Sequence, residues 1–179
     1  TFSYTPFNIL VYQQEALIGQ ITLGEASYIS EVTYISGGEV TLVEIYDDRG
    51  FISSRDIYEE GTFCYKEYLN QQGHWVIRTH KDATCEVNKE YPAGLKQRYY
   101  ENLEEIKFEK LESYYEQLGA EDSIIVSLTE KNLPYLQKSK GLPKMTLSLF
   151  GNRLSSTSSN LEELGEIAAQ CFAVIVDSN

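Results

Sequence analysis

The chain has few cations, and they are not clustered. Its 179 residues contain 15 Lys and Arg against 27 Asp and Glu, which gives a formal net charge of −12. Contacts to nucleic-acid phosphates need clustered cations, so the composition disfavours a nucleic-acid partner. An anionic membrane surface is an equally poor partner for the chain by itself. The acidity is typical of a soluble cytoplasmic protein, which is the localisation that we expect.

Cysteine is scarce, and long apolar runs are absent. Cys64, Cys85 and Cys171 show no metal-binding spacing, and an odd number of cysteines does not make a disulfide framework. We therefore expect reduced thiols in a reducing compartment and no metal site. The longest apolar run, 171–176, is far shorter than the roughly 20 residues of a membrane-spanning helix, so we expect no membrane span. No signal peptide is visible, but the chain starts without Met, and we interpret it as a piece of a longer protein.

Motifs for nucleotide and nucleophile chemistry are missing as well. No GxGxxG or GxxxxGK[ST] sequence offers a cradle for phosphate, and no GxSxG sequence offers a nucleophile elbow. His74 and His80 flank one predicted strand and would need ligands from another element to hold a metal ion, so we interpret them as surface or turn residues. The serine-rich stretch 155–159 favours a loop over a group of nucleophiles. We expect no cofactor and no catalytic residue in this chain.

What the sequence does have is a repeat of glycine-containing turns. Gly38, Gly50, Gly61 and Gly73 are spaced 12, 11 and 12 residues apart, and apolar or aromatic runs separate them. Strands of five to seven residues joined by tight turns have this spacing, so residues 1–92 are predicted to form an antiparallel β-meander domain. Such a sheet offers a broad face and two edges, which favours binding over catalysis.

Tyrosine is concentrated in the same region. Eleven of the 14 tyrosines lie in the first 100 residues. They are typical of cross-strand packing on a half-buried sheet, and they are equally the side chains of an aromatic platform for a partner. The candidate binding residues of this platform are Tyr34, Tyr46, Tyr58 and Trp75.

The pattern changes from strand to helix at residue 93. Apolar residues recur at steps of three and four from Leu95 to Leu118, which predicts an amphipathic helix of about six turns that ends at Gly119. Strands are then predicted at 123–128, 146–150 and 172–176, with helices at 130–138 and 160–169 between them. An alternating order of helices and strands implies parallel pairing, so residues 93–179 are predicted to be a partial Rossmann-like α/β domain.

One loop of the second half is a candidate ligand site. Open parallel sheets bind ligands beyond the carboxyl ends of their strands, and residues 150–153 place a glycine, an amide and Arg153 there. Arg153 is suited to a phosphate or carboxylate. The alternative is a structural ion pair of Arg153 with Glu162 or Glu163.

Three motifs resemble the first of the accessory secretory proteins of the accessory Sec system, a family of Gram-positive bacteria that export serine-rich-repeat adhesins. The motifs are YDDRGFISS at 46–54, YLNQQGHWVIRTH at 68–80 and LSLFGNR at 147–153. The resemblance implies a glycosyltransferase-like GT-B scaffold with an inserted, extended β-sheet domain. This chain is then expected to contain that β domain and part of one Rossmann-like domain.

The resemblance further implies a non-catalytic subunit that works at the membrane periphery. Its expected partners are the accessory motor ATPase, the sister accessory proteins and the serine-rich-repeat adhesin that the complex delivers to the membrane translocase. Related glycosyltransferases share the architecture. The alternative is therefore a fragment of an N-acetylglucosaminyltransferase that modifies Ser/Thr-rich adhesins, with its donor site outside this chain.

Overall fold

A computed structural model of the chain describes most of residues 1–127 and part of the remainder. The described residues are 1–25, 27–119, 121–127, 145–149, 165–166, 168–169, 171 and 173–176. The chain divides into two compact units, Thr1–Lys107 and Phe108–Asn179. The predicted boundary at residue 92 remains a prediction.

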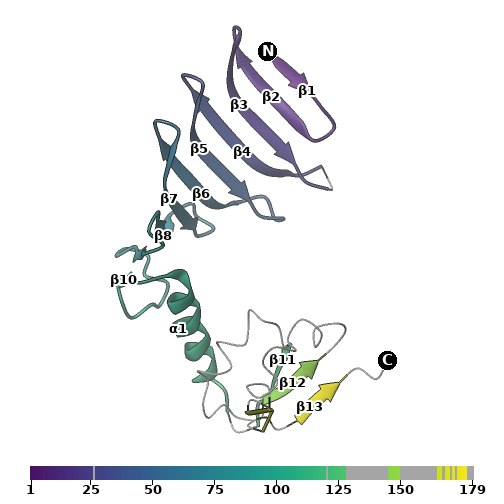
Figure 1. The fold of residues 1–179 in the computed structure, drawn as a ribbon, viewed down its shortest axis with the longest axis vertical. Coiled ribbons are helices and arrows are strands. Elements are labelled where there is room, and N and C mark those ends of the chain that lie inside the picture. The colour runs from purple at the N-terminus through teal and green to yellow at the C-terminus, as the bar shows by residue number, and fades with distance from the viewer. Residues whose placement is uncertain are drawn as a thin grey trace. The chain divides into compact units, whose positions relative to one another are not determined.

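The first unit is built on a ten-stranded antiparallel sheet in which every strand pairs with its neighbours in the chain (Figure 1). Its strands are β1 (Phe2–Tyr4), β2 (Asn8–Gln13), β3 (Ala16–Leu23), β4 (Ile29–Ser36), β5 (Glu39–Tyr46), β6 (Ile52–Glu59), β7 (Thr62–Leu69), β8 (Trp75–His80), β9 (Cys85–Val87) and β10 (Tyr99–Tyr100). The predicted meander is confirmed. Strands β1, β9 and β10 were not predicted, because each has only two or three residues and shows no alternation that can be recognised in the sequence.

Two kinds of turn alternate along the meander, and together they explain the spacing of the glycines. Two-residue turns with both central residues at positive φ join β4 to β5 and β6 to β7, at Gly37–Gly38 and Glu60–Gly61. Longer turns of five residues join β5 to β6 and β7 to β8. One turn of each kind makes a unit of about 23 residues.

The five-residue turns share one hydrogen-bond pattern. In the 47–51 turn the Asp47 N–H donates to the Phe51 carbonyl at 3.0 Å, and the Gly50 N–H donates to the Asp47 carbonyl at 3.0 Å. Turns 24–28, 70–74 and 80–84 repeat both bonds at 2.8–3.0 Å. The fourth residue of the turn has positive φ each time, with +88° at Gly50 and +70° at Ala83. The glycine repeat therefore marks positions that need left-handed backbone.

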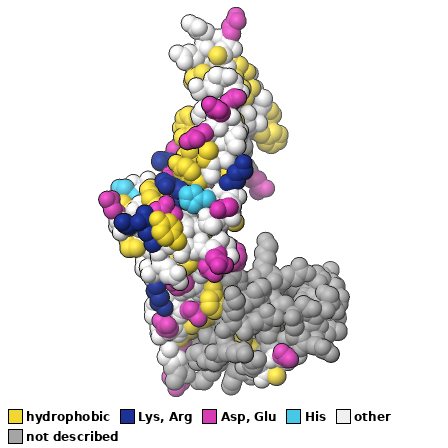
Figure 2. All heavy atoms as spheres, turned by 60° about the vertical axis from the view of Figure 1, so that its left-hand side comes forward, with side chains coloured by type: hydrophobic (Ala, Val, Ile, Leu, Met, Phe, Trp, Pro, Cys, Tyr) yellow, Lys and Arg dark blue, Asp and Glu magenta, His cyan; other side chains and the backbone are white. Residues whose placement is uncertain are grey.

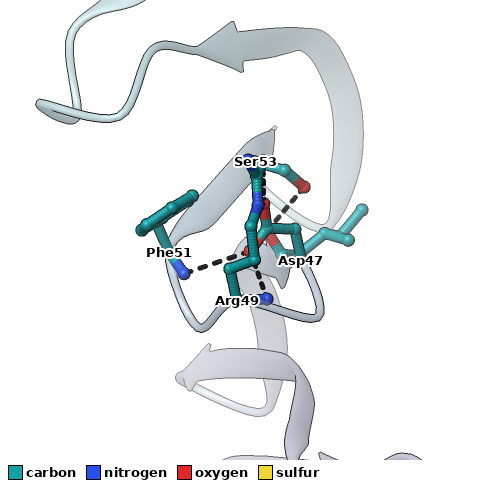
Figure 3. A network of polar contacts seen from close by, with 5 residues as sticks. Asp47, Arg49, Phe51 and Ser53 are labelled. Carbon is teal, nitrogen blue, oxygen red and sulfur yellow. Dashed lines mark hydrogen bonds and ion pairs between the residues drawn. The ribbon is translucent and has the colours of Figure 1, made fainter.

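Side chains reinforce the turn of the YDDRGFISS motif (Figure 3). The Asp47 carboxylate accepts the Arg49 N–H at 2.9 Å and the Arg49 guanidinium at 2.6 Å, and it also accepts the Phe51 N–H at 3.4 Å. Partial desolvation opposes ionisation of Asp47, but these hydrogen bonds outweigh it and lower the pKa of the carboxyl group. Ser53 Oγ donates to the Ile45 carbonyl at 3.1 Å. The motif stabilises a β-turn, which is a structural role.

The structure corrects the helix predicted at 93–119. Helix α1 is shorter and spans Leu103–Tyr115. Pro92 fixes φ before a turn in which Ala93 and Gly94 have φ of +50° and +71°, so the helix cannot start there. The Asn102 side chain instead accepts the Glu105 N–H at 3.1 Å, and this cap begins the helix ten residues later than predicted.

The second unit contains a three-stranded parallel sheet in the order β11-β12-β13. These strands are β11 (Ile124–Ser127), β12 (Met145–Leu149) and β13 (Ala173–Val176). Met145, Leu147 and Ser148 of the central strand are buried, as expected for a strand with neighbours on both sides. The predicted strands and their parallel pairing are confirmed. Residues 165–166 and 168–169 are helical, whereas the predicted helix at 130–138 lies outside the described residues.

Candidate protein-interaction surface

The register of the large sheet aligns one residue from every strand in a single row across one face. We call this face the front face, and its row runs from β1 to β10 in the order Tyr4, Ile9, Ile21, Val32, Glu44, Arg55, Glu67, Arg78, Glu86, Tyr99. Side chains directly opposite each other on neighbouring strands point to the same face. The row is apolar on β1–β4 and alternates between acid and base on β5–β9.

A second row lies two residues along the strands on the same front face. It contains Phe2, Val11, Gly19, Tyr34, Leu42, Ile57, Tyr65 and His80, from β1 to β8. Because the side-chain period of a strand is two, both rows share the face. We call the first the long row and the second the aromatic row.

The charged half of the long row is held by ion pairs between adjacent strands. Arg55 Nε lies 3.2 Å from Glu44 Oε1, and the Arg78 guanidinium donates to Glu67 Oε1 at 2.8 Å. Glu86 continues the series through a 2.7 Å contact with Arg98. Glu44 and Glu67 are more than nine-tenths buried, with 7% and 9% of their surface exposed. Such pairs fix register, because a shift by one residue would leave these carboxylates without cations.

Aromatic rings enclose one cation of this row. The Arg78 guanidinium carbon lies 4.5 Å from the ring centroids of both Tyr65 and Trp75. Two cation–π contacts stabilise the charge while it stays partly exposed. The backbone carbonyl of Trp75 accepts a 2.8 Å hydrogen bond from the Asn88 side chain, which ties this cluster to the segment after β9.

Two tyrosines share the carboxylate at the start of the charged series. The Tyr34 and Tyr46 hydroxyl groups donate to Glu44 Oε2 at 3.0 and 3.5 Å. Desolvation and the neighbouring Glu44 carboxylate raise the pKa of both tyrosines. They remain neutral hydrogen-bond donors at physiological pH, and Tyr34 keeps 40% of its surface exposed.

The opposite, back face is covered at only one end of the sheet. There Cys85, Val87 and Tyr100 form a buried cluster with Ile106 of α1. Further apolar residues pack around this cluster: Ile77, Leu95 and Leu103. Strands β1–β7, by contrast, make their substantial contacts only with neighbouring strands (Figure 1).

Charge is distributed unevenly between the two ends of the sheet. Residues 1–48 contain seven Asp and Glu and no Lys or Arg. Every ion pair recorded among the described residues lies between Glu44 and Lys107. Figure 2 accordingly shows Lys, Arg and His side chains over the middle of the molecule and none over the N-terminal strands at its top.

The structure brings together three of the predicted platform residues on one connected surface. Tyr34 and Tyr46 flank Glu44, and Trp75 joins the same ion-pair series through Arg78. Tyr58 lies outside both rows, where it packs edge-on against Phe63 at 5.7 Å. Arg153 and its loop lie outside the described residues, so their role remains a prediction.

Sequence reasoning missed the ion-pair series itself. Glu44, Arg55, Glu67 and Arg78 follow one another at intervals of 11, 12 and 11 residues, the same alternation that spaces the glycines. A period that matches the hairpin repeat, with charge changing sign at each step, was the available signal. It becomes a surface only when the strands pair in chain order.

Groups that could support metal chemistry or membrane insertion were also sought. The part of the chain that the structure describes holds no group of three or more His, Cys, Asp or Glu side chains placed to bind a metal ion. Its one α-helix, α1, is too short and too polar to cross a bilayer. His74 stacks on Tyr91 at 4.3 Å, and His80 packs against Tyr65 at 6.3 Å.

These features define the class of the chain: a long antiparallel sheet with an exposed, patterned face, followed by a parallel α/β unit. The family model for accessory secretory protein 1 of the accessory Sec system matches residues 1–178. The chain therefore belongs to this family. The corresponding protein of Streptococcus gordonii is 30% identical over 168 residues, which are 91% of this chain and 32% of that protein. The chain thus spans about a third of the length of this relative.

Solved structures with a similar fold come from two sources. The glycosylation-associated protein (Gap123) complex of Streptococcus agalactiae contains a chain with a TM-score of 0.83 and 25% identity; the match covers 99% of this chain and 36% of that one. The structure of accessory secretory proteins 1, 2 and 3 of Streptococcus pneumoniae gives a TM-score of 0.76 and 26% identity, covering 98% and 41%. The GtfA/B complex bound to UDP and GlcNAc gives 0.61 at 13% identity, covering 97% and 45%, which shows a shared fold.

Proposed function

We propose that the chain is the interaction module of a non-catalytic component of the accessory Sec export complex. In this proposal the parent protein is cytoplasmic, associates peripherally with the membrane and helps to deliver glycosylated serine-rich-repeat adhesins to the translocase. The carrying observation is the exposed front face, where a register-locked ion-pair series presents Tyr34, Tyr46 and Trp75 in a fixed arrangement. Membership in the accessory Sec family supports the setting.

The expected partners are the sister accessory proteins and the motor ATPase. The relatives of known structure were solved as complexes of several accessory or glycosylation-associated proteins, which supports sister subunits as partners. Rigid aromatic side chains next to an arginine are the residue types that dominate protein interfaces. The ion pairs hold these side chains in place, so binding orders few additional groups.

The test uses the full-length protein, its two sister accessory proteins and the motor ATPase, each purified separately. Mixtures are analysed by size-exclusion chromatography with light scattering. Tyr34→Ala on the front face is expected to weaken at least one complex by tenfold or more, whereas Thr33→Ala on the back face of the same strand is the matched control. Wild-type protein that forms no complex with any of these partners would refute the proposal.

The second unit is proposed to be part of a Rossmann-like domain of a GT-B scaffold, with the β domain bounded near residue 92. The parallel sheet and the shared fold with the GtfA/B complex support this interpretation. The same likeness favours the alternative function, a fragment of a glycosyltransferase. Binding of UDP-GlcNAc to the full-length protein that is lost in Arg153→Ala would establish that alternative. Absence of sugar-nucleotide binding at millimolar concentration supports the non-catalytic assignment.

A further inference from the structure

The front face of β1–β4 is apolar, and no described element covers it. The two rows supply six apolar side chains there: Phe2, Tyr4, Ile9, Val11, Ile21 and Val32. We call these residues the apolar patch. Phe2 and Tyr4 expose 57% and 72% of their surface, and the other four are half-buried by their neighbours within the sheet. Gly19 adds no side chain to the aromatic row, which leaves a notch between Val11 and Tyr34.

The back face of the same strands is polar, so the patch is not one side of a sheet that is apolar throughout. Rows on the back face place Asn8, Gln20, Thr22 and Thr33 opposite one another on β2–β4. A sheet with one apolar and one polar face normally buries the apolar face against another element. The two-faced sequence of β1–β4 therefore indicates an element that covers the front face.

The other end of the sheet shows what kind of element does this. On β8–β10 the apolar residues lie on the back face, where Leu103 and Ile106 of α1 pack on them. The amphipathic character of the sheet thus reverses between its ends, and at one end an amphipathic helix covers the apolar face. Four strands about 4.8 Å apart give the patch a width of about 14 Å, which suits one helix of roughly 10 Å diameter.

The charge around the patch sets the chemistry of that helix. The turns and strands of this region carry Glu15, Glu25, Glu31 and Glu39, and none of them has an ion-pair partner among the described residues. Residues 1–48 contain no cation to balance them. Complementarity therefore favours a partner with Lys and Arg beside its apolar side chains, and it disfavours an anionic lipid surface.

We propose that the apolar patch is the docking site for a basic amphipathic helix of a protein partner. Apolar side chains of the helix lie across Ile9, Ile21 and Val32, and its flanking Lys or Arg side chains meet the carboxylates of the turns. This inference rests on the proposed function, because it supplies the partner chemistry for one region of the interaction module. It concerns a different set of residues from the ion-pair series.

The first experiment measures binding of two synthetic helical peptides to the full-length protein by fluorescence anisotropy. Both are 18-residue peptides with Leu at the same positions, and the remaining positions carry Lys in one and Glu in the other. The Lys peptide is expected to bind at least tenfold more tightly than the Glu peptide. Ile21→Glu, at the centre of the patch, is expected to reduce that affinity at least tenfold, and Gln20→Glu, on the back face of the same strand, less than twofold.

A second variant separates charge from apolar contact without altering the sheet. The triple variant Glu15→Gln, Glu25→Gln and Glu39→Gln changes only turn and strand-end residues. It is expected to reduce the preference for the Lys peptide to threefold or less. Hydrogen exchange of residues 40–87 that matches the wild type shows that Ile21→Glu and the triple variant keep the sheet intact.

Several results would overturn the inference. They are equal affinities for the two peptides, equal effects of Ile21→Glu and Gln20→Glu, protection of the patch from carbene labelling in the free full-length protein, a homodimer that Ile21→Glu dissociates, and tighter binding to phosphatidylglycerol vesicles than to the Lys peptide. With the sister proteins as probes, complexes that form equally well with Ile21→Glu would also exclude the patch as their contact. That result would leave the proposed function standing, whereas no complex at all would refute the function alone.

Discussion

The two ends of the large sheet use opposite faces for their apolar residues. At β8–β10 the apolar side chains lie on the back face and are covered by the chain itself, with Ile106 only 3% exposed. At β1–β4 they lie on the front face, and no described element covers them. The ion-pair series on β5–β9 stands between the two ends. The comparison teaches that one continuous sheet can be anchored at one end and available for binding at the other.

The largest expected effect concerns the covered end. Ile106→Ala is expected to reduce local stability by about 2–4 kcal/mol, because it removes a buried side chain and leaves a cavity. Ile21→Ala in the apolar patch is expected to cost only about 1 kcal/mol, since that site is already half-exposed. Hydrogen exchange of residues 75–106 and 8–36 in the full-length protein measures both. Equal costs would show that the patch is covered in the intact molecule.

The ion-pair series between the two ends is expected to come next. Glu67→Gln is expected to reduce the stability of β6–β8 by about 1–3 kcal/mol, because Arg78 loses a charged hydrogen-bond partner on a largely buried site. Glu59→Gln, in the exposed turn that begins on β6, is the control and should change little. Urea unfolding of both variants, followed by tryptophan fluorescence of Trp75, tests the difference. An unchanged midpoint for Glu67→Gln would mean that apolar contacts alone hold these strands.

The five-residue turns offer a smaller and bidirectional test. Gly50→Ala is expected to reduce stability by about 1–2 kcal/mol, because Gly50 has φ of +88°. Ala83→Gly should have the opposite sign and raise stability by up to about 1 kcal/mol, since Ala83 occupies the equivalent position at +70°. Thermal unfolding of the two variants measures both signs. Destabilisation by Ala83→Gly would contradict the equivalence of the two turns.

The smallest effect is expected at alkaline pH. Burial and the Glu44 carboxylate raise the pKa of Tyr34 and Tyr46, so the folded protein resists their ionisation more than the unfolded chain does. Their contribution to stability is complete below the ordinary tyrosine pKa of about 10 and is lost as pH rises through the raised values. Urea unfolding at increasing pH should therefore show a decline that is weaker in the Tyr34→Phe, Tyr46→Phe double variant. An equal decline in both proteins would contradict the cause assigned here.

Much of the fold could be predicted because it is local. The turns at Gly38, Gly50, Gly61 and Gly73 were found from their spacing, and the strands between them followed. The helix was misplaced because its apolar period continues through Leu95 and Tyr99, whereas the backbone of residues 92–94 prevents helix and Tyr99 pairs with Glu86 in β10. Periodicity reports which residues share a face, but it does not report where hydrogen bonding begins.

The candidate site was predicted only in part. Tyr34, Tyr46 and Trp75 were proposed from their residue type, and the structure connects them through Glu44 and Arg78. Tyr58 had the same sequence signal and lies elsewhere, because a register shift next to it pairs it with Phe63. Residue type marks candidates for binding, whereas register decides which of them meet.

The sequence by itself determined the antiparallel meander, its turns and the parallel strands of the second unit, because each depends on residues close together in the chain. The tertiary structure decided the long row, the reversal of the apolar face and the exposure of the patch on β1–β4. These depend on contacts between strands whose register accumulates over ten neighbours. A shift of one residue at any turn would move half of these side chains to the other face.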